Sequence, residues 1–190
     1  MTYFLDFDRT ILDTDSFTPS IADYPAVREL REQILEVAST KRDRSIRGQS
    51  GRMELWEKLN ELCSEGKLIF APGELSKFVF PDAVEFLKNH GNDSVILSFG
   101  HKSWIESKIE SSLSNLPLQT VEYAHDREKG IALKSILKNY SAPYIVVDDL
   151  ATQLDSIKEH CPEVSLFEIR RDGEAPSGRH AVIHSLLELP

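Results

Sequence analysis

Along most of the chain, short continuous runs of hydrophobic residues alternate with segments in which hydrophobic residues recur at helical spacing. Apolar runs that predict buried strands occupy residues 3–5, 94–98, 118–123, 144–147 and 164–169. Apolar side chains recur at the spacing of amphipathic helices over residues 81–91, 103–112, 130–140, 150–160 and 180–189. Because strands alternate with helices of about ten residues, the pattern predicts an α/β fold with a doubly wound, Rossmann-like parallel sheet.

The stretch between the first two predicted strands has a different pattern. Its apolar residues predict helices over about 25–37 and 52–64, with no further strand. We therefore expect a catalytic core made of residues 1–14 and 79–190. Residues 15–78 are expected to form a small helical cap inserted after the first strand.

Composition narrows the class of protein. The chain has 190 residues and 41% hydrophobic content, which suits one globular core with a modest insertion. Its net charge of -9 argues against general nucleic-acid binding, which needs a basic surface. No apolar run approaches the roughly 18 residues of a membrane helix, and the first strand starts without a basic leader region. We expect a cytoplasmic protein without membrane contact and with free thiols; its oligomeric state stays open.

Two aspartates stand directly after the first strand. Asp6 and Asp8 belong to an Asp-x-Asp-x-Thr sequence that ends at Thr10. Residues two apart in an extended segment point to the same side, so both carboxylates start toward one place at the carboxyl end of the strand. Open α/β sheets bind ligands at that edge. Buried carboxylates are costly unless they are paired or bind a metal, although a solvated turn is the simpler alternative.

Further polar residues follow the later strands. Ser98 ends the second strand, and the acidic pair Asp148 and Asp149 ends the fourth. Ser98 could be only a strand-end hydroxyl, and one of the two aspartates could cap the next helix. Lys129 stands where the helix after the third strand begins; the other candidate lysines are Lys102 and Lys134.

Taken in order, these four motifs resemble those of the haloacid dehalogenase-like superfamily. The resemblance covers residues 1–14 and about 80–190, and the helical insertion lies at the superfamily's cap position. The resemblance implies that Asp6 is a nucleophile and Asp8 a general acid and base. It implies a Mg²⁺ site made of Asp6, the backbone carbonyl of Asp8 and Asp149, with Asp148 as a further ligand or as an orienting group.

The same resemblance assigns the phosphate-binding groups. Ser98 and the backbone N–H groups of Phe99 and Gly100 are expected to hold phosphoryl oxygens. Lys129 is expected to neutralise charge on the nucleophile and on the phosphate. Thr10 is expected to tie the first loop by hydrogen bonds.

These roles predict a Mg²⁺-dependent phosphatase that acts on a small phosphorylated metabolite through an aspartyl-phosphate. Dehalogenases of the superfamily lack the acid and base at the position of Asp8, so its presence favours phosphoester chemistry. A phosphoryl transferase or mutase on the same scaffold is the first alternative. A receiver-like signalling domain and a non-catalytic protein that binds Mg²⁺ or a partner are the others, and the order of the motifs disfavours the receiver.

A locally basic stretch in the predicted cap contains Arg44 and Arg47. Such a stretch is usually a solvated surface loop. In a cap it could instead bind the leaving group of the substrate, since arginine binds a second carboxylate or phosphate in a bidentate manner.

Overall fold

A computed structural model describes residues 1–39, 50–124, 128–171, 173 and 175–190. The chain divides into two compact units. The first unit contains residues 1–12, 79–100 and 115–190, and the second contains residues 13–78 and 101–114. Residues 101–114 thus group with the second unit, although the sequence pattern assigned them to the core. The predicted division into a core and a cap stays a prediction.

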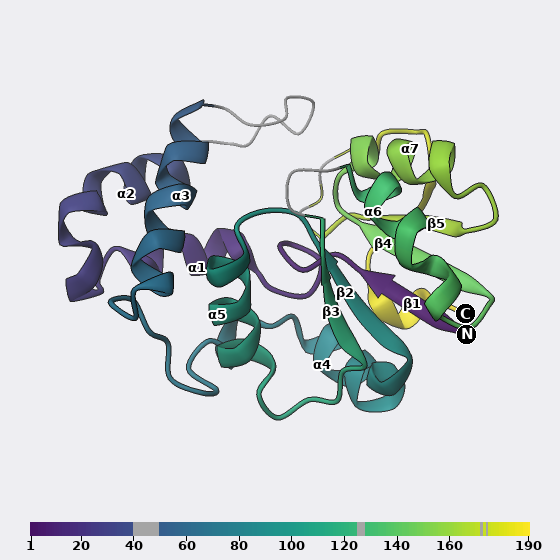
Figure 1. Cartoon of the computed structure of the whole chain (residues 1–190), viewed down its shortest axis with the longest axis horizontal. Helices are drawn as coiled ribbons and strands as arrows, with labels where there is room; N and C mark the ends of the chain where they lie inside the picture. Colours follow the sequence, from purple (N-terminus) through teal and green to yellow (C-terminus); the bar gives the residue numbers. More distant parts are fainter. Residues whose placement is uncertain (40–49, 125–127, 172, 174) are drawn as a thin grey trace. The chain divides into compact units, whose positions relative to one another are not determined.

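The first unit is built on one parallel sheet of six strands (Figure 1). Its strands are β1 (Thr2–Leu5), β2 (Ser94–Ser98), β3 (Thr120–Tyr123), β4 (Tyr144–Asp148), β5 (Ser165–Ile169) and β6 (Ala181–Ile183). They lie in the order β3-β2-β1-β4-β5-β6, and every neighbouring pair is parallel. The predicted α/β fold with a parallel, Rossmann-like sheet is confirmed. The sequence order of the strands runs outward from β1 in both directions, and β1 pairs with β2 on one side and β4 on the other.

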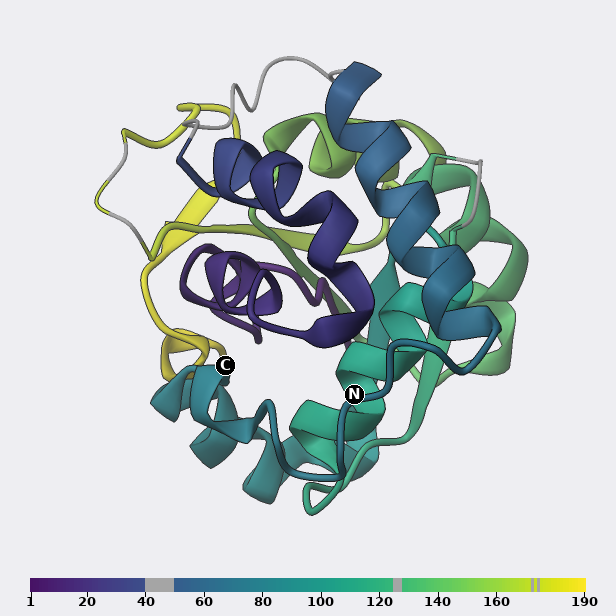
Figure 2. The ribbon, with the colours of Figure 1, turned by 90° about the vertical axis from the view of Figure 1, so that its left-hand side faces the viewer.

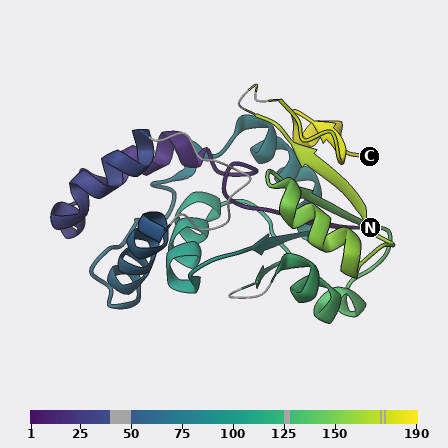
Figure 3. The same cartoon turned by 90° about the horizontal axis from the view of Figure 1, so that it is seen from above.

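Helices cover both faces of this sheet (Figure 3). Two neighbouring side chains of β1 contact these two layers. Phe4 packs in one apolar cluster with Leu133 and Leu154. The neighbouring Tyr3 points to the opposite face, where its ring centroid lies 5.0 Å from that of Phe86. The helices of this unit are α4 (Pro81–His90), α6 (Lys129–Ile136), α7 (Ala151–His160) and the 3₁₀ turns η3 (Gly91–Asp93), η4 (Leu137–Asn139) and η5 (Leu186–Glu188).

The helix expected over residues 180–189 is wrong. The chain forms β6 there, pairs it with β5, and then makes the short turn η5. Val182 and Ile183 are β-branched and fit a strand, and Ile183 is buried. The Ser185 side chain accepts a hydrogen bond from the backbone N–H of Leu187, which starts the turn.

The second unit is helical (Figure 2). Its elements are α1 (Thr14–Ile21), η1 (Pro25–Leu30), α2 (Arg31–Ser39), α3 (Ser50–Ser64), η2 (Ser76–Phe78) and α5 (Lys102–Leu113). Trp104 of α5 stacks with Trp56 and Phe17 at centroid distances of 6.1 and 6.0 Å. This aromatic contact explains why α5 groups with this unit. The helix predicted from residue 25 forms as η1 followed by α2, and Val27 and Ile34 are buried in it.

Among the residues that the structure describes, no helix combines the length and the apolar character needed to cross a membrane.

Candidate active site

The site is built around Asp6, the first residue after β1. Its backbone N–H donates to the carbonyl oxygen of Val147 at 2.9 Å, which continues the pairing of β1 with β4. Asp6 therefore lies beside Asp148 at the carboxyl ends of two central parallel strands. Both side chains are buried. A pair of carboxylates at this position requires positive charge nearby, because an uncompensated buried charge is costly.

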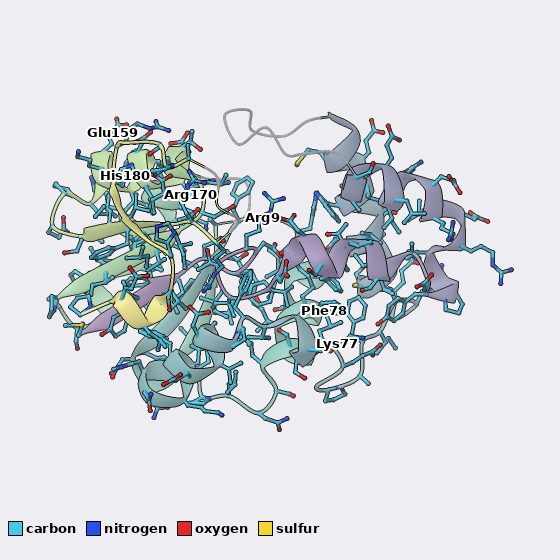
Figure 4. All side chains as sticks on the ribbon, turned by 180° about the vertical axis from the view of Figure 1, so that it is seen from behind. Arg9, Lys77, Phe78, Glu159, Arg170 and His180 are labelled. Carbon is cyan, nitrogen blue, oxygen red and sulfur yellow. The ribbon has the colours of Figure 1, made fainter. Side chains whose placement is uncertain are left out.

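The loop after Asp6 turns sharply. The carbonyl oxygen of Phe7 accepts hydrogen bonds from the backbone N–H groups of Ile11 and Leu12 at 2.9 and 3.0 Å. Arg9, which is labelled in Figure 4, has a φ of 67°, a left-handed conformation that is uncommon for residues other than glycine. The turn brings Thr10 back toward Asp6, where its hydroxyl donates to Asp6 Oδ2 at 3.3 Å. Asp8 is half-buried in this loop.

Lys129 supplies the positive charge. It begins α6, its side chain is only 3% exposed, and its Nζ atom lies 2.5 Å from Asp6 Oδ1 and 2.6 Å from Asp148 Oδ2. Burial by itself would lower the pKa of Lys129, but the carboxylates of Asp148 and Asp6 outweigh it and hold that pKa above its ordinary value. The alternative candidate Lys134 is exposed, and Lys102 forms an exposed ion pair with Glu106. Of the three lysines considered, the structure brings Lys129 to Asp6.

Three buried carboxylates lie together at this edge. Oxygen atoms of Asp6, Asp148 and Asp149 all lie within 4.8 Å of one another. Three carboxylates against one ammonium group leave an excess of two negative charges. The pKa of Asp148 is raised to about 7, mainly because the side chain is buried. The neighbouring Asp6 and Asp149 carboxylates raise this pKa further, and Lys129 opposes the rise. Hard oxygen donors with excess negative charge fit a divalent cation such as Mg²⁺.

The alternative role of the acidic pair, as the cap of the next helix, is not found: Leu150 is the N-cap residue of α7, and no side-chain hydrogen bond caps the helix there. Asp148 Oδ1 accepts a hydrogen bond from the backbone N–H of Leu150 at 2.8 Å, just before α7 begins at Ala151. Asp148 thus orders the start of that segment while its other oxygen contacts Lys129. One residue therefore both orders the backbone before α7 and pairs with Lys129.

The predicted phosphate-binding segment follows the next strand of the sheet. Ser98 is the last residue of β2, which pairs with β1, and its side chain is buried. Phe99 is exposed, and Gly100 has a φ of 137°, a backbone conformation that residues other than glycine rarely adopt. The segment starts at the sheet edge that carries Asp6, and its contact with phosphate stays a prediction. Arg44 and Arg47 lie outside the described residues.

Sequence reasoning missed two buried residues that contact this site. The side-chain oxygen of Gln153 faces the backbone N–H of Lys129 at 3.4 Å. The guanidinium group of Arg170 donates to the carbonyl oxygen of Asp149 at 3.2 Å. The available signal for Arg170 was the charged sequence Glu168-Ile169-Arg170 at the end of a predicted buried strand.

No protein-family model and no curated protein matches the sequence. Solved structures do match. A Burkholderia xenovorans LB400 protein assigned as a haloacid dehalogenase-like hydrolase superimposes with a TM-score of 0.66 at 22% identity, covering 100% of this chain and 98% of its own. The HAD-hydrolase YfnB of Bacillus subtilis, solved with bound magnesium, gives a TM-score of 0.56 at 14% identity, with coverages of 98% and 95%. A dehalogenase solved as an intermediate complex gives 0.60 at 16% identity, with coverages of 98% and 94%.

This chain has the haloacid dehalogenase-like fold. The likeness confirms the fold that the four sequence motifs implied and extends over the helical insertion. At these identities it establishes the haloacid dehalogenase-like architecture alone, so the activity has to be inferred from the residues of the site.

Proposed function

We propose that this protein is a Mg²⁺-dependent phosphatase that hydrolyses a small phosphorylated metabolite in the cytoplasm. The observation that carries the proposal is the buried group formed by Asp6, Lys129, Asp148 and Asp149, with Asp8 two residues after Asp6. A carboxylate nucleophile, a cation to neutralise it and a second carboxyl for proton transfer are what phosphoester hydrolysis by this route requires.

The first half of the reaction is attack by an Asp6 carboxylate oxygen on phosphorus. A bond forms between that oxygen and phosphorus, the bond to the leaving oxygen breaks, and protonated Asp8 gives its proton to the leaving alcohol. In the second half, Asp8 takes a proton from water, the water oxygen forms a bond to phosphorus, and the bond between phosphorus and the Asp6 oxygen breaks, which releases inorganic phosphate. Asp6 returns as a carboxylate and Asp8 as an acid, so the cycle closes.

Other groups of this chain stabilise the charges. Lys129 already contacts Asp6, so its ammonium group is placed to offset charge as the phosphoryl group arrives. The hydroxyl of Thr10 orients the second oxygen of Asp6. Ser98 and the backbone N–H groups of Phe99 and Gly100 bind phosphoryl oxygens in this proposal.

A bound Mg²⁺ ion would offset the repulsion between the carboxylate and the phosphate. Asp6, the backbone carbonyl of Asp8, Asp149 and Asp148 are the groups that would hold it. The donor set supports this assignment, because it consists of oxygens only and carries excess negative charge. The relative YfnB was solved with magnesium, which agrees with the proposed metal.

Dehalogenation is the competing hydrolase chemistry, since a dehalogenase is among the similar structures. A halide ion is a weak base and leaves without a proton, so that reaction has no use for an acid at Asp8. The alcohol released from a phosphate ester needs such a proton. Asp8 therefore favours the phosphatase. A phosphoryl transferase or mutase, in which a second alcohol replaces water, remains the alternative on the same residues.

The test is a panel of phosphorylated metabolites and an aryl phosphate, assayed for released inorganic phosphate with Mg²⁺ and with excess chelator. L-2-Haloacids, assayed for released halide, serve as the comparison substrates. We expect phosphate release that needs Mg²⁺ and no halide release. Halide release without phosphate release would replace the phosphatase by a dehalogenase, and phosphate release only when an alcohol acceptor is present would favour the transferase.

A further inference from the structure

Two adjacent arginines, Arg170 and Arg171, follow β5 at the edge of the sheet that carries the acidic cluster. We call them the arginine pair. The backbone N–H of Arg170 donates to the carbonyl oxygen of Ile183 at 2.9 Å, so pairing with β6 continues past the end of β5. Neighbouring residues of an extended segment point in opposite directions. The side chains of the pair accordingly reach two different loops, and both are largely buried.

Arg170 reaches the loop after β4 (Figure 4 labels this residue). Its Nη1 atom donates to the carbonyl oxygen of Asp149, and its Nη2 atom pairs with Glu168, which is fully buried. Ser177 holds the same carboxylate through its backbone N–H, at 2.9 Å, and through its hydroxyl. Burial alone would raise the pKa of Glu168, but the hydrogen bonds from Ser177 and Arg170 bring it below its ordinary value. Glu168 is therefore a fixed anion that orients Arg170.

Arg171 reaches the loop after β1. Its Nε atom donates to the carbonyl oxygen of Thr10 at 2.9 Å, and its two terminal nitrogens bind Asp82 at 2.8 and 3.0 Å. The guanidinium plane also lies 4.1 Å from the ring centroid of Phe80. Asp82 is anchored by the backbone N–H of Leu186 at 2.7 Å. The planar guanidinium group of Arg171 has little rotational freedom with this many directional contacts. Its hydrogen bond to the carbonyl oxygen of Thr10 therefore restricts the position of that carbonyl.

From this geometry we propose that the arginine pair positions the two loops whose carboxylates form the reactive cluster. Each arginine donates to a backbone carbonyl of the loop concerned, Arg170 to that of Asp149 and Arg171 to that of Thr10. Arg170 sets the place of Asp149 as a metal ligand, and Arg171 sets the place of the loop between Asp6 and Thr10. One dipeptide thereby fixes the spacing between the nucleophile loop and the acidic loop. This inference rests on the proposed function.

Lysine substitutions test the pair, because lysine keeps the charge but lacks the planar fork that serves two acceptors at once. Arg170→Lys should raise the Kd for Mg²⁺ by about tenfold, since groups that orient a metal ligand typically matter by 10- to 100-fold. This Kd is measured with Mg²⁺ alone, from the increase in Tm with Mg²⁺ concentration. Ser177→Ala removes one hydrogen bond to Glu168 and should shift the same Kd in the same direction by less.

Arg171→Lys should lower kcat by about 10- to 100-fold, because a small misplacement of a reacting group has effects of that size. Its KM should change by less than about threefold, since attack is impaired while the substrate contacts remain. Arg179→Lys is the matched control: Arg179 forms an exposed ion pair with Asp155, and all three constants should stay at their wild-type values.

An unchanged Kd for Mg²⁺ in Arg170→Lys would overturn the role of Arg170. An unchanged kcat in Arg171→Lys would overturn that of Arg171. Both conclusions hold even if the substitution changes the Tm of the metal-free protein. If the wild-type protein binds Mg²⁺ but hydrolyses no phosphate ester, the proposed function fails. The Mg²⁺ measurement on Arg170→Lys then still decides whether Arg170 positions Asp149.

Discussion

The Nζ atom of Lys129 lies 2.5 Å from Oδ1 of Asp6, although 123 positions separate the two residues in the sequence. The same nitrogen contacts Asp148 at 2.6 Å. An ammonium group between two buried carboxylates attracts both of them and so keeps the three side chains together. The proposed nucleophile thus has a cation beside it before any substrate arrives.

Asp6→Asn should abolish turnover and preserve the fold. The amide has nearly the same shape but cannot form an acyl phosphate, and removal of a nucleophile typically lowers kcat by about 10⁴-fold or more. The measurement is phosphate release together with the Tm. Asp155→Asn, at an exposed ion pair, is the control and should keep full activity. Retention of a tenth of the wild-type rate in Asp6→Asn would exclude this residue as the nucleophile.

Asp8→Asn should slow both halves of the reaction, and the loss should depend on the leaving group. An aryl phosphate with a good leaving group needs little protonation, so its first step should be partly rescued and phosphoenzyme should accumulate on Asp6. Rapid-quench trapping of the labelled protein measures that species. Equal losses for good and poor leaving groups, with no trapped phosphoenzyme, would contradict the acid and base role.

Asp82→Asn should destabilise the protein near neutral pH and not in acid. Burial alone would raise the pKa of Asp82, but hydrogen bonds from Arg171 and the N–H of Leu186 bring it below its ordinary value of 3.8. A group with a lowered pKa in the folded state contributes stability above its unfolded pKa and loses it as the pH falls through the folded pKa. The free energy of unfolding should drop by about 1–2 kcal/mol near pH 7.

Urea denaturation of the wild type and of Asp82→Asn at about pH 7, 5 and 3 checks this, and the difference should shrink below about pH 4. Glu65→Gln is a suitable control, since the exposed ion pair of Glu65 with Lys67 should contribute little to stability at any of these pH values. A difference for Asp82→Asn that is the same at all three pH values would show that its charge is not the cause.

Gly130→Ala should reduce both stability and activity. A Cβ atom at this position would lie 2.2 Å from the carbonyl oxygen of Ser156, so α6 and α7 would have to move apart. Overpacking of this kind typically costs about 1–3 kcal/mol. Lys129 is the preceding residue and would be displaced from Asp6, which should lower kcat as well. Ile131→Ala, on an exposed position of the same helix, should change neither the Tm nor kcat.

The elements with a clear period were predictable, and those decided by distant partners were not. The continuous apolar run at 144–147 and the aspartates after it located β4 and the acidic pair. By contrast, Pro19 lies inside α1 and obscures a helix that Asp13 caps through the N–H of Ser16. The strand at 181–183 forms because it pairs with the edge of β5, a distant partner that the local sequence pattern does not predict.

The residues of the candidate site also fall into two groups, those that the sequence predicts and those that only the packing reveals. Asp6, Asp148 and Lys129 were predicted because each stands at the end of a strand or the start of a helix, where the topology of a parallel sheet brings residues together. Arg170 and Arg171 were not predicted to take part, since their partners Asp149 and Thr10 are defined only by three-dimensional packing. Sequence spacing locates the groups that react, and packing determines what holds them.

The central place of β1 has a consequence for how the protein is made. The strand that carries Asp6 precedes the other five strands of the sheet in the sequence, yet its two neighbours in the sheet are residues 94–96 and 144–147. During synthesis β1 can pair with β2 first, and its other edge stays unpaired until β4 has emerged. Loops of this length make such contacts slow to form. The acidic cluster is therefore completed only after Asp148 and Asp149 have joined Asp6, and the proposed metal site cannot form earlier.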